Sequence, residues 1–245
     1  MTETIAEKLT LTVSDGTSMD AFVARPAAGG KSPGVMIFQE AFGVTGHIRD
    51  VAKRFAREGY VAIAPELFHR TAPGELSYTD FSAVMPHMQA LTNENQQSDI
   101  RAAFSWLQKD PQADSTRVGC VGFCMGGRTS YLASATVPLQ AAVSFYGGGI
   151  GPSTRGPSLL PLAPGLNAPM LFFWGGLDKH IPLQQTRPIE DALQEAGKEF
   201  VNVKISFADH AFFRDGGPNY SAKAAALAWA LTKEFLEQNM QSQLK

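Results

Sequence analysis

Cysteine is scarce in this chain, and its scarcity excludes one class of protein. Only two cysteines, Cys120 and Cys124, occur among 245 residues, too few for the disulfide scaffold of a small secreted domain. They lie four residues apart in an apolar segment, and extended residues at that spacing are roughly 13 Å from each other, beyond the reach of a disulfide. Both are therefore expected to be free thiols, which suits a reducing compartment.

Long apolar runs and an excess of one charge are also missing. No stretch approaches the roughly 18 consecutive apolar residues of a membrane span, and the polar, acidic start of the chain has no apolar signal core. A formal net charge of −2 gives no electrostatic reason to bind nucleic acid or an anionic membrane. The chain is therefore predicted to be cytoplasmic, with neither nucleic acid nor a membrane as its partner.

The histidines of the chain lack the spacing of a metal site. There are five of them, and none belongs to a motif such as H-E-x-x-H. We therefore expect no metal ion, and nothing in the sequence calls for another cofactor.

The chain does contain a regular alternation of apolar strands and amphipathic helices. The turn pair Asp15-Gly16 between two strand-like segments predicts an N-terminal antiparallel hairpin. Apolar segments predict strands over 34–38, 61–65, 117–123, 141–147, 168–175 and 200–207, and helical spacing predicts helices over 46–60, 97–109, 126–135, 182–197 and 221–238. This alternation is typical of an α/β protein with a mostly parallel sheet covered by helices on both faces. No break in the pattern divides it, so a single domain over residues 1–245 is expected.

Three finer expectations follow from this layout. Pro188 should break or kink its helix. Residues 68–95 and 147–167 should be long loops, the first with one short helix. The apolar stripe of the last helix is predicted to consist of Ala224, Leu227, Ala228, Leu231 and Phe235.

The segment GFCMG, residues 122–126, is the first sign of chemistry. It joins a predicted strand to a predicted helix and matches the G-x-nucleophile-x-G turn with cysteine in place of serine. A side chain at either glycine would collide in so sharp a turn, and the N-terminus of the next helix favours a thiolate at Cys124. Alternatively, Cys124 is a packed apolar residue, as free cysteine often is. Cys120, inside the strand, is expected to fill the core.

An acid and a histidine follow the cysteine in the order that such a hydrolase requires. Asp178 comes shortly after one predicted strand, and His210 shortly after the next. Because sites in open α/β sheets form at the carboxyl ends of parallel strands, we expect the two side chains to lie near Cys124. His180 is a rival histidine, but it is only two residues from Asp178. Taken singly, Asp178 and His210 could be a turn aspartate and a surface histidine.

Five blocks of sequence resemble one family in family order. They are FQEAFGV (38–44), APELFHRTAPG (64–74), GFCMGG (122–127), GGLDKHIP (175–182) and DHAFFRD (209–215). The chain thus resembles the dienelactone hydrolases, or carboxymethylenebutenolidases, which are α/β-hydrolases with a cysteine nucleophile. The resemblance implies a monomeric, cofactor-free enzyme that cleaves a lactone or small ester through an acyl-enzyme.

The resemblance also implies roles for residues outside the triad. A family glutamate that contacts the cysteine corresponds to Glu40, which would hold the thiol proton until substrate arrives. The backbone N–H groups of Ala41 and Met125 would form the oxyanion hole, since the fold supplies one donor from each of these two turns.

One family feature for binding substrate is missing from this sequence. Arg214 matches one of two family arginines that bind a substrate carboxylate, but residues 71–100 contain neither arginine nor lysine where the second should be. Arg155 is a candidate replacement, and Phe81 and Tyr146 are candidate pocket residues. Arg70 and Arg128 are expected to be structural, and Arg128, in the first turn of a helix, should have an anionic partner.

Two other functions stay open at this point. A thioesterase or a general carboxylesterase could use the same triad. A hydrolase-fold binding protein that has lost turnover is the alternative from another class.

Overall fold

The structure is a computed structural model that describes residues 3–71, 74–153 and 156–241. Its strands are β1 (Thr4–Thr12), β2 (Ser18–Pro26), β3 (Ser32–Phe38), β4 (Val61–Pro65), β5 (Ala113–Phe123), β6 (Ala141–Phe145), β7 (Met170–Gly175) and β8 (Phe200–Ile205). Its helices are α1 (Gly46–Arg57), α2 (Phe81–Ala90), α3 (Asn93–Lys109), α4 (Met125–Ser134), the 3-10 helix η1 (Leu160–Gly165), α5 (Leu183–Glu195) and α6 (Ala222–Asn239). The chain forms two compact halves, residues 1–120 and 121–245, whose boundary falls inside β5.

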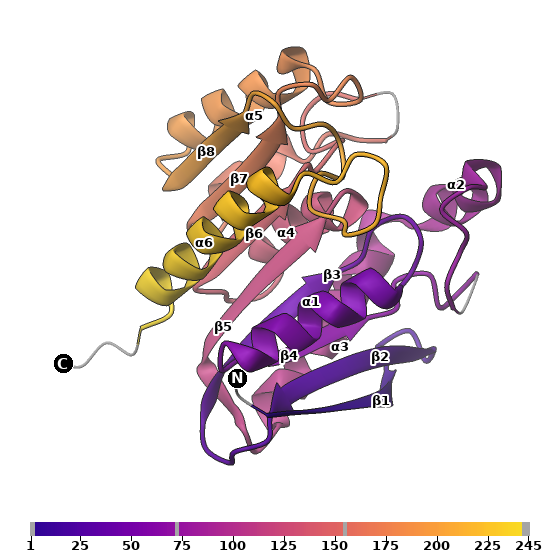
Figure 1. The fold of residues 1–245 in the computed structure, drawn as a ribbon, viewed down its shortest axis with the longest axis vertical. Coiled ribbons are helices and arrows are strands. Elements are labelled where there is room, and N and C mark those ends of the chain that lie inside the picture. Colours follow the sequence, from indigo (N-terminus) through magenta and orange to yellow (C-terminus); the bar gives the residue numbers. More distant parts are fainter. Residues whose placement is uncertain (1–2, 72–73, 154–155, 242–245) are drawn as a thin grey trace. The chain divides into compact units, whose positions relative to one another are not determined.

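The first half is built on the antiparallel hairpin predicted from Asp15-Gly16. Gly16 takes a φ of +86°, which the tight turn requires. The strand order is β1-β2-β4-β3-β5, with β2 antiparallel and β3 parallel to β4. Helices α1 and α3 pack on opposite faces of these strands (Figure 1). The predicted stripe of α1 is buried, at Ile48, Val51, Ala52 and Phe55.

In the second half the strand order is β5-β6-β7-β8, and β6, β7 and β8 run parallel. Helix α4 lies on one face of its strands and α6 on the other (Figure 1). The mostly parallel eight-stranded sheet with an antiparallel N-terminal hairpin is the predicted fold class. Strands β6 and β7 are buried at every residue, which is why they appear in the sequence as unbroken apolar runs.

Several boundaries differ from the predictions for identifiable reasons. Strand β5 begins at Ala113 rather than 117. The prediction missed this start because residues 114–116 are polar and not buried. Helix α3 begins at Asn93 rather than 97, because the Thr92 hydroxyl accepts the N–H of Asn95 and caps the helix. Helix α5 continues through Pro188, which removes one backbone hydrogen bond but does not end the helix. The loop after β6 contains η1.

The predicted stripe of the last helix is wrong in one place. Leu227 is 55% exposed, whereas Ala225, Thr232 and Leu236 are buried. At 100° per residue the buried face is centred between Ala224 and Ala225, and Leu227 lies far to one side of it. The prediction relied on hydrophobicity alone, which favours a leucine over the threonine that in fact faces the core.

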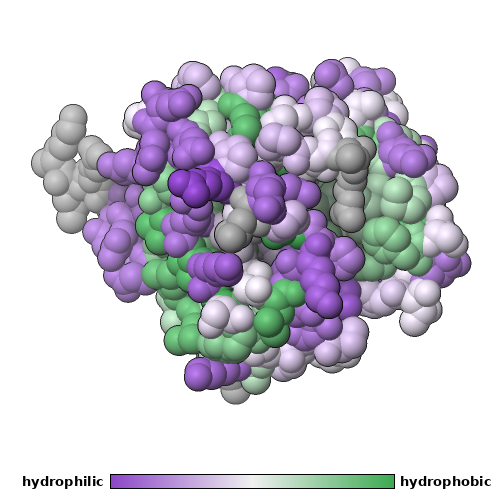
Figure 2. Space-filling model, turned by 90° about the horizontal axis from the view of Figure 1, so that it is seen from above, coloured by the Kyte–Doolittle hydropathy of each residue, from purple (hydrophilic) through white to green (hydrophobic). Residues whose placement is uncertain are grey.

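The surface carries apolar side chains among polar ones. Figure 2 shows both kinds interspersed on the face in view. Large apolar residues that are exposed are Ile5, Tyr78, Phe81, Leu177, Val201, Phe207, Tyr220 and Leu227. Within the described residues, no helix combines the length and the apolar character that crossing a bilayer would require.

Candidate active site

Cys124 occupies a strained turn between β5 and α4. Its φ of +54° lies in a region that non-glycine residues rarely enter. The turn is held by the Cys124 N–H, which donates to the Phe145 carbonyl at 3.0 Å. A Cβ at Gly122 would lie 1.9 Å from the Gly126 carbonyl oxygen, so the first glycine of the motif is sterically required. Cys124 is partly exposed as a residue, and Cys120 is fully buried; both are free thiols.

The turns after β7 and β8 bring Asp178 and His210 together with Cys124. His210 Nε2 lies 3.3 Å from Cys124 Sγ, and His210 Nδ1 lies 2.7 Å from Asp178 Oδ2. The other carboxylate oxygen of Asp178 accepts the N–H of His180 at 2.7 Å. His180 thus contacts Asp178 through its backbone, while its exposed ring lies 5.6 Å from that of His210.

The electrostatics of this group favour a charged histidine. Burial opposes a charge on His210, but the thiolate of Cys124 and the hydrogen bond to Asp178 raise the pKa of His210 to about 10. Burial of Asp178 acts to raise its pKa, yet the hydrogen bond and charge of His210 hold that pKa below the usual value. At neutral pH the arrangement can therefore hold an ion pair between Cys124 and His210, oriented by an ionised Asp178.

Tyr146 is the predicted pocket residue that the structure places beside this group. Its ring lies 5.1 Å from the His210 ring, and its backbone has a φ of +40°. The side chain is fully buried, and its part in binding substrate stays a prediction. Arg214 lies four residues beyond His210 and is partly exposed. Arg155 lies outside the described residues.

The remaining predicted residues belong to the first half. Glu40 and Ala41 are buried in the turn after β3. Phe81 begins α2, is 49% exposed, and has its ring 6.5 Å from that of Phe42. Within the described chain, neither the Ala41 N–H nor the Met125 N–H has an acceptor. Their approach to Cys124 stays a prediction.

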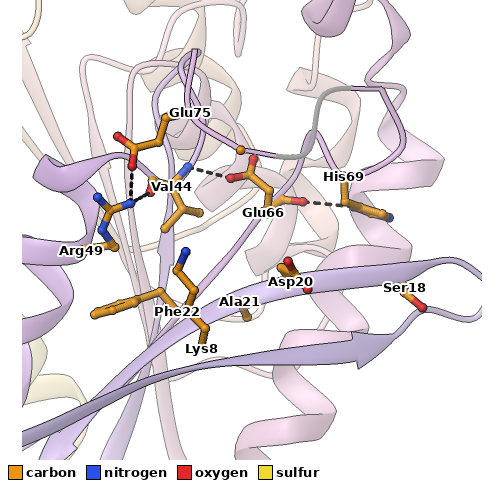
Figure 3. Close-up of a pocket in the computed structure, with 11 residues that line it drawn as sticks. Lys8, Ser18, Asp20, Ala21, Phe22, Val44, Arg49, Glu66, His69 and Glu75 are labelled. Atoms are coloured by element: carbon orange, nitrogen blue, oxygen red, sulfur yellow. Dashed lines mark hydrogen bonds and ion pairs between the residues drawn. The ribbon is translucent and has the colours of Figure 1, made fainter. Parts of the chain in front are cut away.

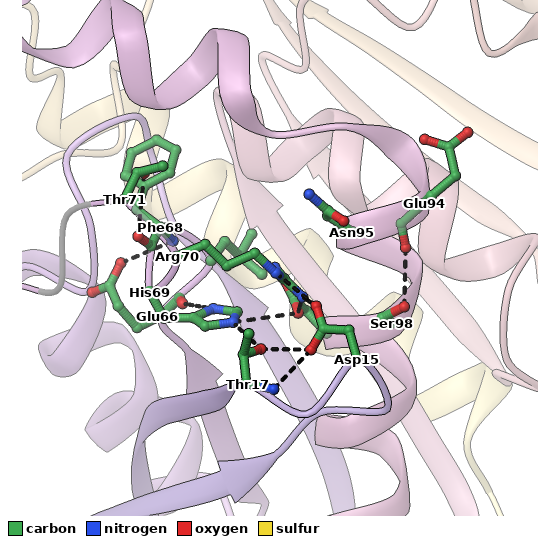
Figure 4. A network of polar contacts seen from close by, with 12 residues as sticks. Asp15, Thr17, Glu66, Phe68, His69, Arg70, Thr71, Glu94, Asn95 and Ser98 are labelled. Carbon is green, nitrogen blue, oxygen red and sulfur yellow. Dashed lines mark hydrogen bonds and ion pairs between the residues drawn. The ribbon is translucent and has the colours of Figure 1, made fainter.

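The two arginines expected to be structural lie in different settings. Arg70 pairs with Asp15 and Asp99 at 2.6 and 2.9 Å, which ties the hairpin turn to the segment after β4 and to α3 (Figure 4). This confirms its structural role. Arg128 donates to the carbonyl oxygens of Gly149 and Pro157, and its anionic partner stays a prediction.

Sequence reasoning missed Gln39 and Glu66, two buried polar residues at the ends of β3 and β4. A signal was available, because each is a polar residue that directly follows a buried strand or its terminal proline.

In the described part of the chain, no group of three or more His, Cys, Asp or Glu side chains is placed to hold a metal ion.

Comparisons with known proteins show which family the chain belongs to. The model of the dienelactone hydrolase family matches residues 19–240. A protein named "Putative carboxymethylenebutenolidase" from Synechocystis sp. (strain ATCC 27184 / PCC 6803 / Kazusa) is 35% identical over 243 residues, which cover 97% of this chain and 98% of that protein. One of the same name from Escherichia coli (strain K12) is 36% identical over 230 residues, which cover 92% and 84%.

A solved structure shows the same likeness in three dimensions. It is described as a "Putative Dienelactone Hydrolase" from Klebsiella pneumoniae subsp. pneumoniae MGH 78578, and its TM-score is 0.89 at 34% identity. The match covers 96% of this chain and 99% of that one. With a family model over most of its length and relatives of similar size, this chain belongs to the dienelactone hydrolase family, hydrolases that act on ester bonds, within the α/β-hydrolase superfamily.

Proposed function

We propose that the protein is a cysteine-nucleophile hydrolase that cleaves a lactone or a small carboxylic ester. The observation that carries this proposal is the chain of contacts from Cys124 Sγ to His210 and from His210 to Asp178. We propose further that it works in the cytoplasm as a monomer without a cofactor.

The proposed reaction proceeds through an acyl-enzyme. The Cys124 thiolate attacks the substrate carbonyl carbon and forms a tetrahedral oxyanion. As the oxyanion collapses, the C–O bond to the alcohol breaks and the Nε2 proton of His210 passes to the leaving oxygen. His210 then takes a proton from water, the hydroxide attacks the thioester, and the thiolate leaves from a carboxylic acid product. Asp178 keeps the imidazole oriented and stabilises its positive charge.

The oxyanion in this proposal is stabilised by the N–H groups of Ala41 and Met125. Both N–H groups lack an acceptor within the described residues, and the Met125 group is one of the orphan donors at the start of α4. A donor of this kind contributes because it is held in place before charge develops. Glu40 is proposed to keep the resting thiol of Cys124 neutral and to take its proton when substrate arrives.

Substrate type is tested by comparing esters of different chemistry. The panel contains lactones, aryl esters and thioesters, each with and without a carboxylate, and kcat/KM is measured for every member. We expect lactones and small esters to be turned over best. A clear preference for thioesters would favour the thioesterase alternative, and acylation of Cys124 without product release would favour a binding protein.

A further inference from the structure

We propose that Glu66 is a positioning residue that holds the oxyanion loop, residues 39–45, in place for catalysis. It acts together with Gln39, and the two form a latch between the turns after β3 and β4. The inference rests on the proposed function, because it assigns a task to the loop that carries Ala41.

The latch consists of reciprocal hydrogen bonds from each turn to the other. Glu66, after β4, accepts the N–H of Val44 at 2.9 Å through Oε2 (Figure 3). Gln39, after β3, accepts the N–H of Leu67 at 3.0 Å through its side-chain oxygen. Each side chain therefore crosses to the neighbouring turn, and Ala41 lies between the two points of attachment.

The loop also packs closely against the segment that follows β4. Gly43 has a φ of +88°, and a Cβ there would lie 2.6 Å from the Gly74 carbonyl oxygen and 3.2 Å from Glu66 Oε2. The Leu76 N–H also donates to the Phe42 carbonyl at 2.9 Å. Glu66 thus contacts the loop at one point, and the segment 74–76 contacts it at others.

Glu66 holds this position at a cost to stability. Its side chain is only 5% exposed, and burial raises the pKa of Glu66 to about 7, against the lowering effect of the Val44 and Phe68 N–H groups. A cavity of about 450 Å³ borders the carboxyl group. The charged and titratable groups that line this cavity with it are Lys8, Asp20, Arg49, His69 and Glu75.

A neutral side chain would be cheaper to bury here, so stability does not explain the carboxyl group. A carboxylate does make stronger hydrogen bonds to backbone N–H groups than a neutral acceptor. This favours a role in fixing the loop, in line with the trade between stability and activity at functional sites.

The test compares Glu66→Gln with Asp20→Asn, a variant that removes an exposed carboxylate from the same cavity without touching the loop. Turnover of 4-nitrophenyl acetate is measured per active thiol, together with inhibition by butanal, whose adduct with Cys124 needs the oxyanion donors. For Glu66→Gln we expect kcat to fall about tenfold to a hundredfold, less than the roughly hundredfold to thousandfold fall that follows outright loss of an oxyanion donor. KM should stay within about twofold, butanal should bind correspondingly less tightly, and the melting temperature should not fall.

Several results would overturn the inference. One is a kcat within about twofold of wild type, and another is a kcat and melting temperature that fall together. Equal losses in Asp20→Asn would also overturn it. Turnover by Cys124→Ala would instead refute the proposed function itself.

Hydrogen exchange in the wild type gives a second test that needs no folded variant. After correction for intrinsic rates, the Val44 amide should be better protected above pH 7, where Glu66 is ionised, than below it. Unchanged protection across this range would count against the latch.

Discussion

At the scale of single residues, the charge on the Cys124 sulfur decides how the protein reacts. The 3.3 Å contact with His210 allows an ion pair, and the raised pKa of His210 favours it. Glu40, as proposed, acts in the opposite direction, because a carboxylate beside the sulfur disfavours a second negative charge. The resting thiol then reflects a balance between these two neighbours.

Replacing Glu40 tests this balance. Glu40→Gln should speed alkylation of Cys124 by iodoacetamide about tenfold at neutral pH, because it removes a negative charge beside the sulfur. The rate is measured against pH, with Cys120→Ala as the background so that only one thiol reacts. Identical pH profiles for the two proteins would show that Glu40 does not act on the sulfur.

Substrate charge is the second question at this scale. Arg214 keeps one of the two arginines that the resemblance implies, and a charge-assisted hydrogen bond contributes about 1.5–3 kcal/mol. Arg214→Ala should therefore lower kcat/KM for carboxylate-bearing esters about tenfold to a hundredfold. Neutral esters of the same shape should be nearly unaffected.

The two substrate classes serve as each other's control in that experiment. An equal drop for both would mean that Arg214 supports the His210 turn rather than binding charge. A hundredfold or larger preference of the wild type for a dicarboxylate would point to another cation, with Arg155 as the first candidate.

The contacts among Cys124, Asp178 and His210 could be anticipated from the sequence because each residue follows an apolar strand. Their order and the glycines of the turn carried enough information to expect them near one another. Glu66 also follows an apolar strand, but its task could not be predicted from the sequence, since it depends on which neighbouring turn its side chain reaches. That pairing is set by the tertiary packing of β3 beside β4.

At the scale of elements, the turn between β5 and α4 depends on glycine. Gly122→Ala would place a Cβ against the Gly126 carbonyl oxygen and should reduce the free energy of unfolding by about 3 kcal/mol. Ester turnover should fall as well, because the turn aims Cys124. Gly165→Ala is the control, since no atom lies near a Cβ at that position. A Gly122 variant as stable and active as Gly165→Ala would contradict the described turn.

Elements with a buried apolar face were predicted well, whereas the polar first turn of a helix was not. β6 and β7 are buried throughout, and their short apolar runs favour strands over helices because of their length. Helix α3 begins earlier than predicted, because its first turn is polar and only the Thr92 cap marks it. Leu227 was misplaced for the converse reason, because an exposed leucine looks like a core residue in sequence.

At the scale of the whole molecule, buried charge makes stability depend on pH. Burial raises the pKa of Glu66 from 4.5 to about 7, so between these values the folded chain keeps a proton that the unfolded chain has lost. Stability therefore falls as pH rises through this window. Relative to Glu66→Gln, the wild type should lose on the order of 3 kcal/mol of unfolding free energy between pH 4.5 and 8.

Denaturant unfolding of both proteins at several pH values checks this. The comparison cancels other titrating groups, His210 among them, because both proteins contain them. A difference between the two that does not change with pH would contradict the raised pKa of Glu66.

The central claim concerns the molecule as a catalyst, and the covalent intermediate tests it most directly. Wild-type protein and Cys120→Ala are mixed with 4-nitrophenyl acetate, quenched in acid within milliseconds, digested and examined by mass spectrometry. Our account predicts one acetyl group on Cys124 in both proteins, formed and lost at rates that match turnover, and neither acetylation nor turnover in Cys124→Ala. Steady turnover by Cys124→Ala, or an acetyl group found elsewhere in the wild type, would contradict it.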